Sequence, residues 1–250
     1  MAKERLDVLT VARGLCESRE QAQRLILAGA VSVDGHPAYK AGVKIASDAV
    51  LRVKAQSRFV SRGGDKLEGA FEAFGWSVAG LQGLDVGAST GGFTECLLVH
   101  GATHVVAADV GRGQLHERLR QDPRVTVLER CNVRYLQPAD LPYPPAFAVF
   151  DVSFISLELV LPPVVAVLVP GGEMVTLIKP QFEAGRAEVG RGGVVRDPVV
   201  REAVVQKIRG FGENKLSLQW LGCVESPLVG PAGNVEYLAW WRKTAGGMTA

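Results

Sequence analysis

The chain has 250 residues, of which 47% are hydrophobic and 22% are charged, so it can bury one full α/β core and a second, smaller module. The formal net charge is +2, but residues 1–62 hold 11 lysines and arginines against 6 acidic residues. A basic first segment indicates an anionic partner. The four cysteines form no C-x-x-C pair, which argues against a zinc site and a disulfide scaffold and favours a reduced, cytoplasmic protein.

The sequence suggests no membrane partner. Residues 1–7 are charged and lack the apolar run of a signal peptide. The longest apolar stretch, 160–170, contains three prolines and is too short to cross a hydrocarbon layer of about 30 Å. We therefore expect a cytoplasmic location.

Residues 1–55 are predicted to form a small α+β domain. Ser18-Arg19-Glu20-Gln21 has the pattern of a capping box at the start of a helix, and Asp34-Gly35 is typical of a tight hairpin turn. The predicted elements are helices at 6–15 and 18–29 and strands at 31–33 and 49–53.

This arrangement resembles the αL RNA-binding motif of a small-subunit ribosomal protein and several pseudouridine synthases. The resemblance implies that basic side chains contact the sugar-phosphate backbone of folded RNA. The other interpretation is a small basic cap on the main domain. The residues expected to contact RNA here are Arg5, Arg19, Arg24, Lys40 and Lys44, with Arg58 and Arg62 just beyond them.

Residues 56–64 are predicted to be a linker, and 65–250 a second domain in which strands and helices alternate. Alternation at this spacing predicts an α/β fold with a doubly wound, Rossmann-like parallel sheet. The last two strands should form an antiparallel hairpin at one side. Strands are predicted at 82–86, 104–109, 125–129, 146–151, 173–178, 216–224 and 235–242, and helices at 65–74, 92–100, 114–121, 156–168 and 198–211.

A glycine-rich loop follows the first of these strands, in the sequence Asp85-Val86-Gly87-Ala88-Ser89-Thr90-Gly91-Gly92-Phe93-Thr94. It matches neither the dinucleotide pattern G-x-G-x-x-G nor a P-loop. The carboxylate of Asp85 favours a cationic ligand over a pyrophosphate, and S-adenosylmethionine fits that preference. The loop residues expected to bind this cofactor are Asp85, Gly87, Ser89, Thr90, Gly91, Gly92 and Phe93.

Polar residues at the carboxyl ends of the next strands are further candidates, because ligands of open α/β sheets bind there. Asp109 can accept hydrogen bonds from both ribose hydroxyls of an adenosine, with Val110 beside it, and Asn132 can address the adenine edge or be a plain loop residue. Asp151 follows a later strand. The sequence around it, Asp151-Val152-Ser153-Phe154, lacks the motifs typical of enzymes that methylate amines or pyrimidine carbons. We expect Asp151 to pair with Lys179.

Four blocks of sequence resemble the TlyA family of FtsJ-like ribosomal RNA 2'-O-methyltransferases, whose members are also called haemolysins. The blocks are the glycine loop, Ser61-Arg62-Gly63-Gly64-Asp65-Lys66-Leu67, Asp151-Val152-Ser153-Phe154-Ile155-Ser156 and Ile178-Lys179-Pro180-Gln181-Phe182-Glu183. The resemblance implies a catalytic tetrad of Lys66, Asp151, Lys179 and Glu236. Glu225 is the alternative to Glu236.

The resemblance implies S-adenosylmethionine-dependent methylation of a ribose, that of a cytidine, in ribosomal RNA or ribosomal subunits, without a metal. Lys179 would act as general base or oxyanion stabiliser. Residues 180–195 are interpreted as a mobile loop over the substrate with Arg186 and Arg191 facing phosphates, or as a loop without function. A membrane-active haemolysin and a non-catalytic ribosome assembly factor stay open as alternatives, as does the choice between monomer and dimer.

Overall fold

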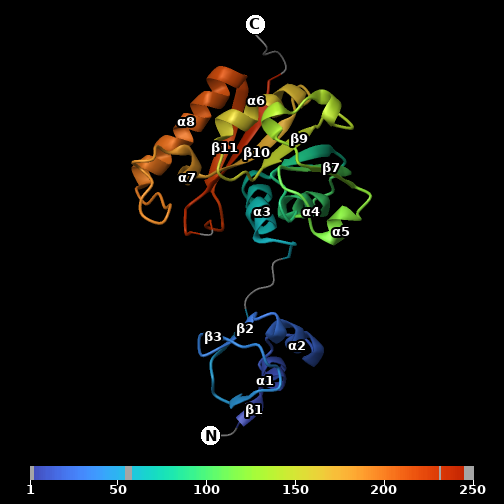
Figure 1. Ribbon diagram of the computed structural model, residues 1–250, viewed down its shortest axis with the longest axis vertical. Helices are drawn as coiled ribbons and strands as arrows, with labels where there is room; N and C mark the ends of the chain where they lie inside the picture. The colour runs from blue at the N-terminus through green and yellow to red at the C-terminus, as the bar shows by residue number, and fades with distance from the viewer. Residues whose placement is uncertain (1–2, 54–57, 231, 245–250) are drawn as a thin grey trace. The chain divides into compact units, whose positions relative to one another are not determined.

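The computed structural model describes residues 3–53, 58–230 and 232–244 (Figure 1). Contacts between residues divide the chain into two units, Met1–Gln56 and Ser57–Ala250. Each unit has a hydrophobic core of its own. Among the described residues, no helix combines the length and the apolar character needed to cross a membrane.

The first unit packs two helices against short strands. Its core contains Leu6 and Leu9 from the first helix and Leu25 and Ile26 from the second. Asp34 and Gly35 both have positive φ, and they form the hairpin turn that the sequence predicts. The elements are β1 (Lys3–Arg5), α1 (Leu6–Ala12), α2 (Arg19–Leu27), β2 (Val31–Val33), β3 (His36–Pro37), β4 (Lys44–Ala46) and β5 (Leu51–Val53).

The predicted capping box at the start of α2 is half correct. The Ser18 hydroxyl accepts a hydrogen bond from the Gln21 backbone N–H at 3.2 Å, as expected of a helix N-cap. The Gln21 side chain, however, accepts from the backbone N–H of Glu17 rather than from that of Ser18. The antiparallel pair of β1 and β4 was not predicted.

The second unit is built on a seven-stranded sheet in the order β11-β12-β10-β9-β6-β7-β8. The five strands from β10 to β8 are parallel, and β12 pairs antiparallel with both β10 and β11. This confirms the predicted doubly wound sheet with an antiparallel hairpin at one side. The strands are β6 (Gln82–Val86), β7 (His104–Asp109), β8 (Val125–Glu129), β9 (Phe147–Phe150), β10 (Glu173–Ile178), β11 (Leu218–Glu225) and β12 (Tyr237–Lys243).

Helices cover both faces of this sheet (Figure 1). Side chains alternate along the buried strand β9: Phe147 and Val149 pack on one face, whereas Ala148 and Phe150 pack on the other. The first face lies against α3 (Arg62–Phe74), α4 (Gly92–Val99) and α5 (Glu117–Arg120). The second lies against α6 (Leu157–Val167) and α8 (Pro198–Leu216).

At the start of the second unit, two boundaries differ from the predictions. Helix α3 begins at Arg62, not Asp65, and Phe59 is buried in the core of the second unit, so residues 59–64 pack with that unit rather than forming a linker. The Ser61 hydroxyl caps the helix by accepting from the Gly63 backbone N–H. Of the other predicted linker residues, Arg58 is exposed, and residues 56 and 57 lie outside the described ranges.

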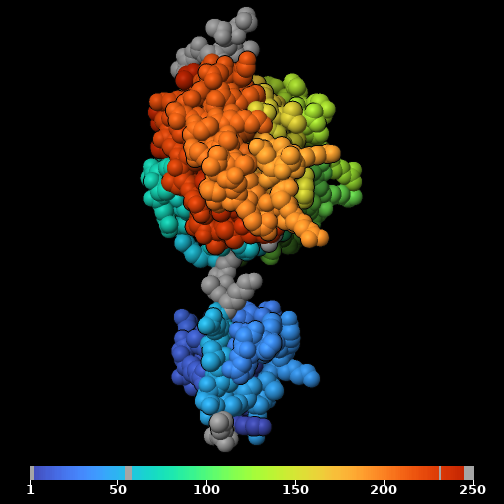
Figure 2. Space-filling view, turned by 90° about the vertical axis from the view of Figure 1, so that its left-hand side faces the viewer, coloured from blue at the N-terminus to red at the C-terminus, as the bar shows by residue number. Residues whose placement is uncertain are grey.

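The segment 180–195 is tied down at several points. It starts with the short helix α7 (Pro180–Glu183), and Asn234, which is buried, bonds the backbone of both Gly193 and Val195 near its end. These contacts hold both ends of the segment against the second unit. In Figure 2 the light-orange segment lies on the surface beside the orange α8, where Arg186 and Arg191 are exposed.

Two glycines in α8 provide a matched test of the packing. A Cβ at Gly212 would lie 2.4 Å from the buried ring of Trp241, whereas a Cβ at Gly210 would lie 3.7 Å from Asn214. We expect Gly212→Ala to lower the free energy of unfolding by about 1–3 kcal/mol through overpacking. Gly210→Ala should raise it by up to about 1 kcal/mol through helix propensity. Urea unfolding measures both, and equal effects would contradict the packing of α8 on β12.

Candidate active site

The glycine loop lies at the point where the strand order reverses, since β6 has β9 on one side and β7 on the other. Ligands of doubly wound folds bind at such switch points, outside the carboxyl ends of the strands. Gly87 has φ 85°, and a Cβ there would lie 2.8 Å from the carbonyl oxygen of Asp151. At Gly92 a Cβ would lie 2.2 Å from the Ser61 hydroxyl. These glycines thus allow close packing within the protein rather than only close approach of a ligand.

Two hollows open at this edge, and Asp151, Gly87 and Ser89 line both. The larger, of about 490 Å³, follows the ends of β7 and β8 and includes Asp109, Val110 and Asn132. The smaller, of about 360 Å³, lies between the loop and α3. Its lining includes Arg62, Lys66, Thr90, Gly92 and Phe93. Gly91 and Asp85 are absent from both linings.

Asp109 is fixed by the backbone around it. Its two carboxylate oxygens accept hydrogen bonds from the N–H groups of Ser89, at 2.8 Å, and Gly111, at 2.7 Å. A carboxylate has about four lone-pair sites, so each oxygen retains capacity for a hydroxyl donor from the hollow. Asn132 is exposed, and its side-chain oxygen caps a 3-10 turn by accepting from the Arg134 N–H.

Asp85 lies beneath the loop rather than at its surface. It is fully buried, and its Oδ2 accepts a hydrogen bond from the Thr94 hydroxyl at 2.6 Å, while Oδ1 has no hydrogen-bond partner. Burial, opposed by the Thr94 bond, raises the pKa of Asp85 to about 7. The expectation that this carboxylate lies in contact with the ligand is therefore not met by its position.

Lys66 and Glu236 form a buried ion pair between α3 and the residue just before β12. Lys66 Nζ lies 2.5 Å from Glu236 Oε2, and both residues are at most 7% exposed. Gln181 donates to the other oxygen of Glu236 at 3.2 Å. Glu225, the alternative candidate, is exposed at the end of β11. The geometry therefore favours Glu236 as the partner of Lys66.

Lys179 and Asp151 make the contact expected from the sequence. Lys179 Nζ lies 2.7 Å from Asp151 Oδ1 and donates to the Ser153 hydroxyl at 2.9 Å. Only 8% of the lysine side chain is exposed, compared with 24% of the Asp151 side chain. The pair therefore presents a carboxylate to both hollows, with a positive charge held behind it.

The first unit organises two of its predicted RNA-binding arginines around one buried acid. Asp7 accepts from Arg5 and Arg19 at 2.9 Å each and from Gln23 at 3.0 Å. The Arg5 guanidinium holds the pKa of Asp7 well below its usual range. About half of each arginine side chain is nevertheless exposed, so both guanidinium groups can still meet a phosphate.

The other predicted RNA-binding residues fall into separate places. Arg24, Lys40 and Lys44 are exposed on the first unit. Arg58 pairs with Glu68 at 3.3 Å. Arg62 lines the smaller hollow, and it donates to the Val229 carbonyl at 3.1 Å. Arg186 and Arg191 line neither hollow.

Three polar residues at these sites were not predicted. Ser153 and Gln181 each lie two residues from a predicted tetrad member, within sequence blocks that had been singled out. Asp7 looked like one of several acidic residues in a basic segment. Its burial depends on α1 and α2 packing together, and no sequence spacing signals that.

The fold and this site define a methyltransferase: a doubly wound sheet with a glycine turn at its switch point and lysine–carboxylate pairs beside it. Residues 59–243 match the model of the FtsJ-like methyltransferase family, and residues 4–51 match the S4 domain. The chain belongs to the TlyA family of FtsJ-like methyltransferases, as the following relatives establish.

The chain is 49% identical to the 16S/23S rRNA (cytidine-2'-O)-methyltransferase TlyA of Mycobacterium tuberculosis, over 96% of this chain and 90% of the relative. It is 50% identical to YqxC of Bacillus subtilis, named as a candidate rRNA methyltransferase, over 94% of this chain and 84% of that protein. A solved structure of a candidate hemolysin from Streptococcus thermophilus matches with TM-score 0.76 and 46% identity, over 98% of this chain and 90% of the other.

The buried Asp85 predicts a pH dependence of stability. Because the pKa of this acid is raised to about 7 on folding, the folded chain keeps a proton that the unfolded chain loses near pH 4. The stabilisation that the folded chain gains from keeping this proton on Asp85 is complete below about pH 4 and is lost as the pH rises through 7. Relative to Asp85→Asn, the free energy of unfolding should fall by about 3 kcal/mol between pH 4.5 and 7.5.

Urea unfolding of both proteins at the two pH values measures this difference. Asp122→Asn is a suitable control, because the Arg124 side chain lowers the pKa of Asp122. This acid is therefore ionised in both the folded and the unfolded chain between pH 4.5 and 7.5, and its contribution should change little over that range. A difference between wild type and Asp85→Asn that does not change with pH would contradict the assignment.

Proposed function

We propose that this protein transfers a methyl group from S-adenosylmethionine to the ribose 2'-hydroxyl of a cytidine in ribosomal RNA. The main support for the proposal is the Lys179–Asp151 ion pair at 2.7 Å. Asp151 of this pair and Lys66 line the same smaller hollow. The reaction named for the M. tuberculosis relative supports the choice of ribose and of cytidine.

The larger hollow suits S-adenosylmethionine. Asp109 offers its remaining lone pairs to the two ribose hydroxyls of an adenosine, and Asn132, which lines the same hollow, would address the adenine edge. Asp151, which lines both hollows, offers a carboxylate to the positively charged sulfonium of the cofactor. When bound, the sulfonium supplies an activated methyl group.

The chain's own residues supply orientation and proton handling. A 2'-hydroxyl is a weak nucleophile, so its oxygen must be held in line with the methyl group while its proton leaves. Lys179, fixed by Asp151 and Ser153, is the group that holds this oxygen, either by accepting the proton or by donating to the oxyanion. Glu236 fixes Lys66, which faces the smaller hollow where the ribose would lie.

The S4 domain provides the RNA contact in this proposal. The arginines held by Asp7 and the exposed Arg24, Lys40 and Lys44 present positive charge that suits a sugar-phosphate backbone. Such contacts bind folded RNA without reading bases, so the choice of nucleotide falls to the second unit.

Incubation of the protein with ribosomal RNA or subunits and tritiated-methyl S-adenosylmethionine tests the proposal. Digestion to nucleosides should place the label in 2'-O-methylcytidine. Label on a base, or transfer to RNA with 2'-deoxycytidine at the mapped position, would contradict it. Release of dye from liposomes by nuclease-treated protein would instead favour the haemolysin alternative, and lack of cofactor affinity would favour an assembly factor.

Lys179→Ala should reduce methyl transfer by at least about 100-fold, because the 2'-oxygen loses its proton acceptor or donor. S-adenosylmethionine affinity, measured by calorimetry, should stay within a few-fold of wild type, since Lys179 does not line the larger hollow, where the cofactor would lie. Lys215→Ala, at an exposed position on α8, is the control and should leave both unchanged. Normal turnover by Lys179→Ala would remove this residue from the mechanism.

A further inference from the structure

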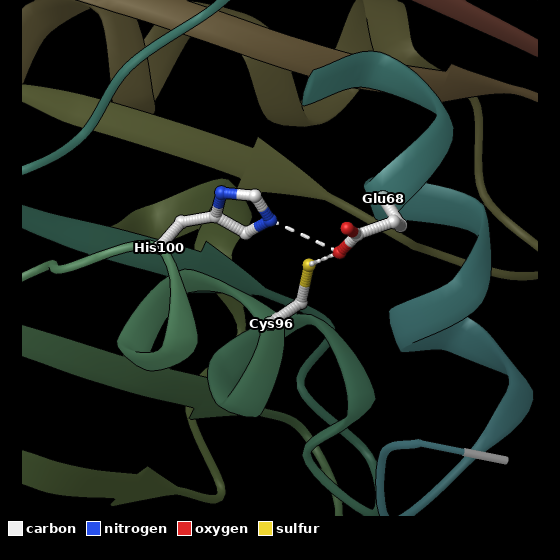
Figure 3. A group of neighbouring side chains, drawn as sticks. All are labelled: Glu68, Cys96 and His100. Atoms are coloured by element: carbon white, nitrogen blue, oxygen red, sulfur yellow. Dashed lines mark hydrogen bonds and ion pairs between the residues drawn. The ribbon is translucent and has the colours of Figure 1, made fainter. Parts of the chain in front are cut away.

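Three side chains with different donor atoms converge between α3 and α4, away from both hollows (Figure 3). Glu68 comes from α3 and Cys96 from α4, and His100 is the C-cap residue that follows α4. Glu68 Oε2 lies 3.0 Å from His100 Nε2 and 3.6 Å from Cys96 Sγ. All three donor atoms lie within 4.8 Å of one another.

We propose that Glu68, Cys96 and His100 bind one Zn²⁺ ion, although the lack of a C-x-x-C pair in the sequence argued against a zinc site. Zinc takes sulfur, imidazole nitrogen and carboxylate oxygen at about 2.0–2.3 Å, and a tetrahedral arrangement then separates the donor atoms by about 3.3–3.7 Å. The separation of 3.6 Å lies within this range and that of 3.0 Å lies just below it, while the distance from Cys96 to His100 is at most 4.8 Å. Side-chain rotations complete the geometry. A thiol in the set favours zinc over magnesium or calcium, and water supplies the fourth ligand.

The surroundings hold the donors in place. The His100 ring stacks on Phe71, with ring centroids 3.6 Å apart and planes at 3°, which fixes the direction of its nitrogens. Cys96 is buried, whereas 28% of the His100 side chain and 17% of the Glu68 side chain are exposed, so the ion enters from the His100 side. Arg58 pairs with the other Glu68 oxygen at 3.3 Å and opposes the ion, but its exposed side chain can turn away.

Binding is a simple exchange of a proton for the metal. The thiolate, not the thiol, is the form of cysteine that binds a metal ion, so Cys96 must lose its proton when the ion binds. The S–H bond breaks as the S–Zn bond forms, and the proton passes to solvent. Carboxylate and thiolate together neutralise the two charges of the ion.

The proposed zinc site adjoins two walls of the smaller hollow. Glu68 lies two residues after Lys66 on α3, and Cys96 lies four residues after Gly92, which lines the smaller hollow. An ion bound by both helices ties these two walls of the hollow together. The site does not depend on the proposed reaction, and its test does not use activity.

The full-length protein, kept reduced and stripped with a chelator, should bind one equivalent of Zn²⁺ by calorimetry. Co²⁺ in its place should give the near-ultraviolet charge-transfer band of a thiolate–cobalt bond. Cys96→Ser should abolish that band, and each of Cys96→Ser, His100→Gln and Glu68→Gln should weaken Zn²⁺ binding by about tenfold or more.

Cys223→Ser and His36→Gln, at a half-buried thiol and an exposed imidazole elsewhere, are the controls and should bind as wild type does. Circular dichroism of each metal-free variant checks that it folds. If Cys96→Ser does not fold, the wild-type cobalt band and the other two variants still decide. No binding by the wild type, no cobalt band, or affinity unchanged in the variants that fold would overturn the proposal.

Discussion

The ion pair between Lys66 and Glu236 is the constraint on which the site depends. It joins α3, at the start of the second unit, to the residue that precedes the last strand of the sheet, and both side chains are almost fully buried. Removing one partner of such a pair leaves an uncompensated charge and costs about 3–5 kcal/mol. Because β12 lies between β10 and β11, the same contact fixes the closing hairpin relative to the carboxyl ends of the parallel strands.

A chain of contacts connects this ion pair to the other residues of the site. Gln181 links Glu236 to the segment after β10. That segment begins with Lys179, whose partner Asp151 is the residue after β9. The backbone carbonyl oxygen of Asp151 in turn lies so close to Gly87 that a side chain there would clash with it. Residues far apart in the chain thus meet at one edge of the sheet, where two hollows share a carboxylate.

Much of this could be predicted from sequence, because parallel strands and glycine turns leave strong local patterns. Strands β6, β7, β8 and β10 have the predicted bounds, and the Lys179–Asp151 contact followed from the cost of an unpaired lysine at a strand end. Asp85 was misplaced because sequence shows that it precedes the loop but not that the loop covers it. The roles of Ser153 and Gln181, and the approach of Glu68 to Cys96 and His100, depend on packing between separate elements, which no local spacing reveals.

A double-mutant cycle on the free energy of unfolding tests the central role of the ion pair most directly. Lys66→Met and Glu236→Gln should each lower it by about 3–5 kcal/mol, since each leaves its partner buried without a counter-charge. The double variant should be destabilised by at least about 2 kcal/mol less than the sum of the two. Effects that add within about 0.5 kcal/mol would show that the two residues act independently and would contradict the account.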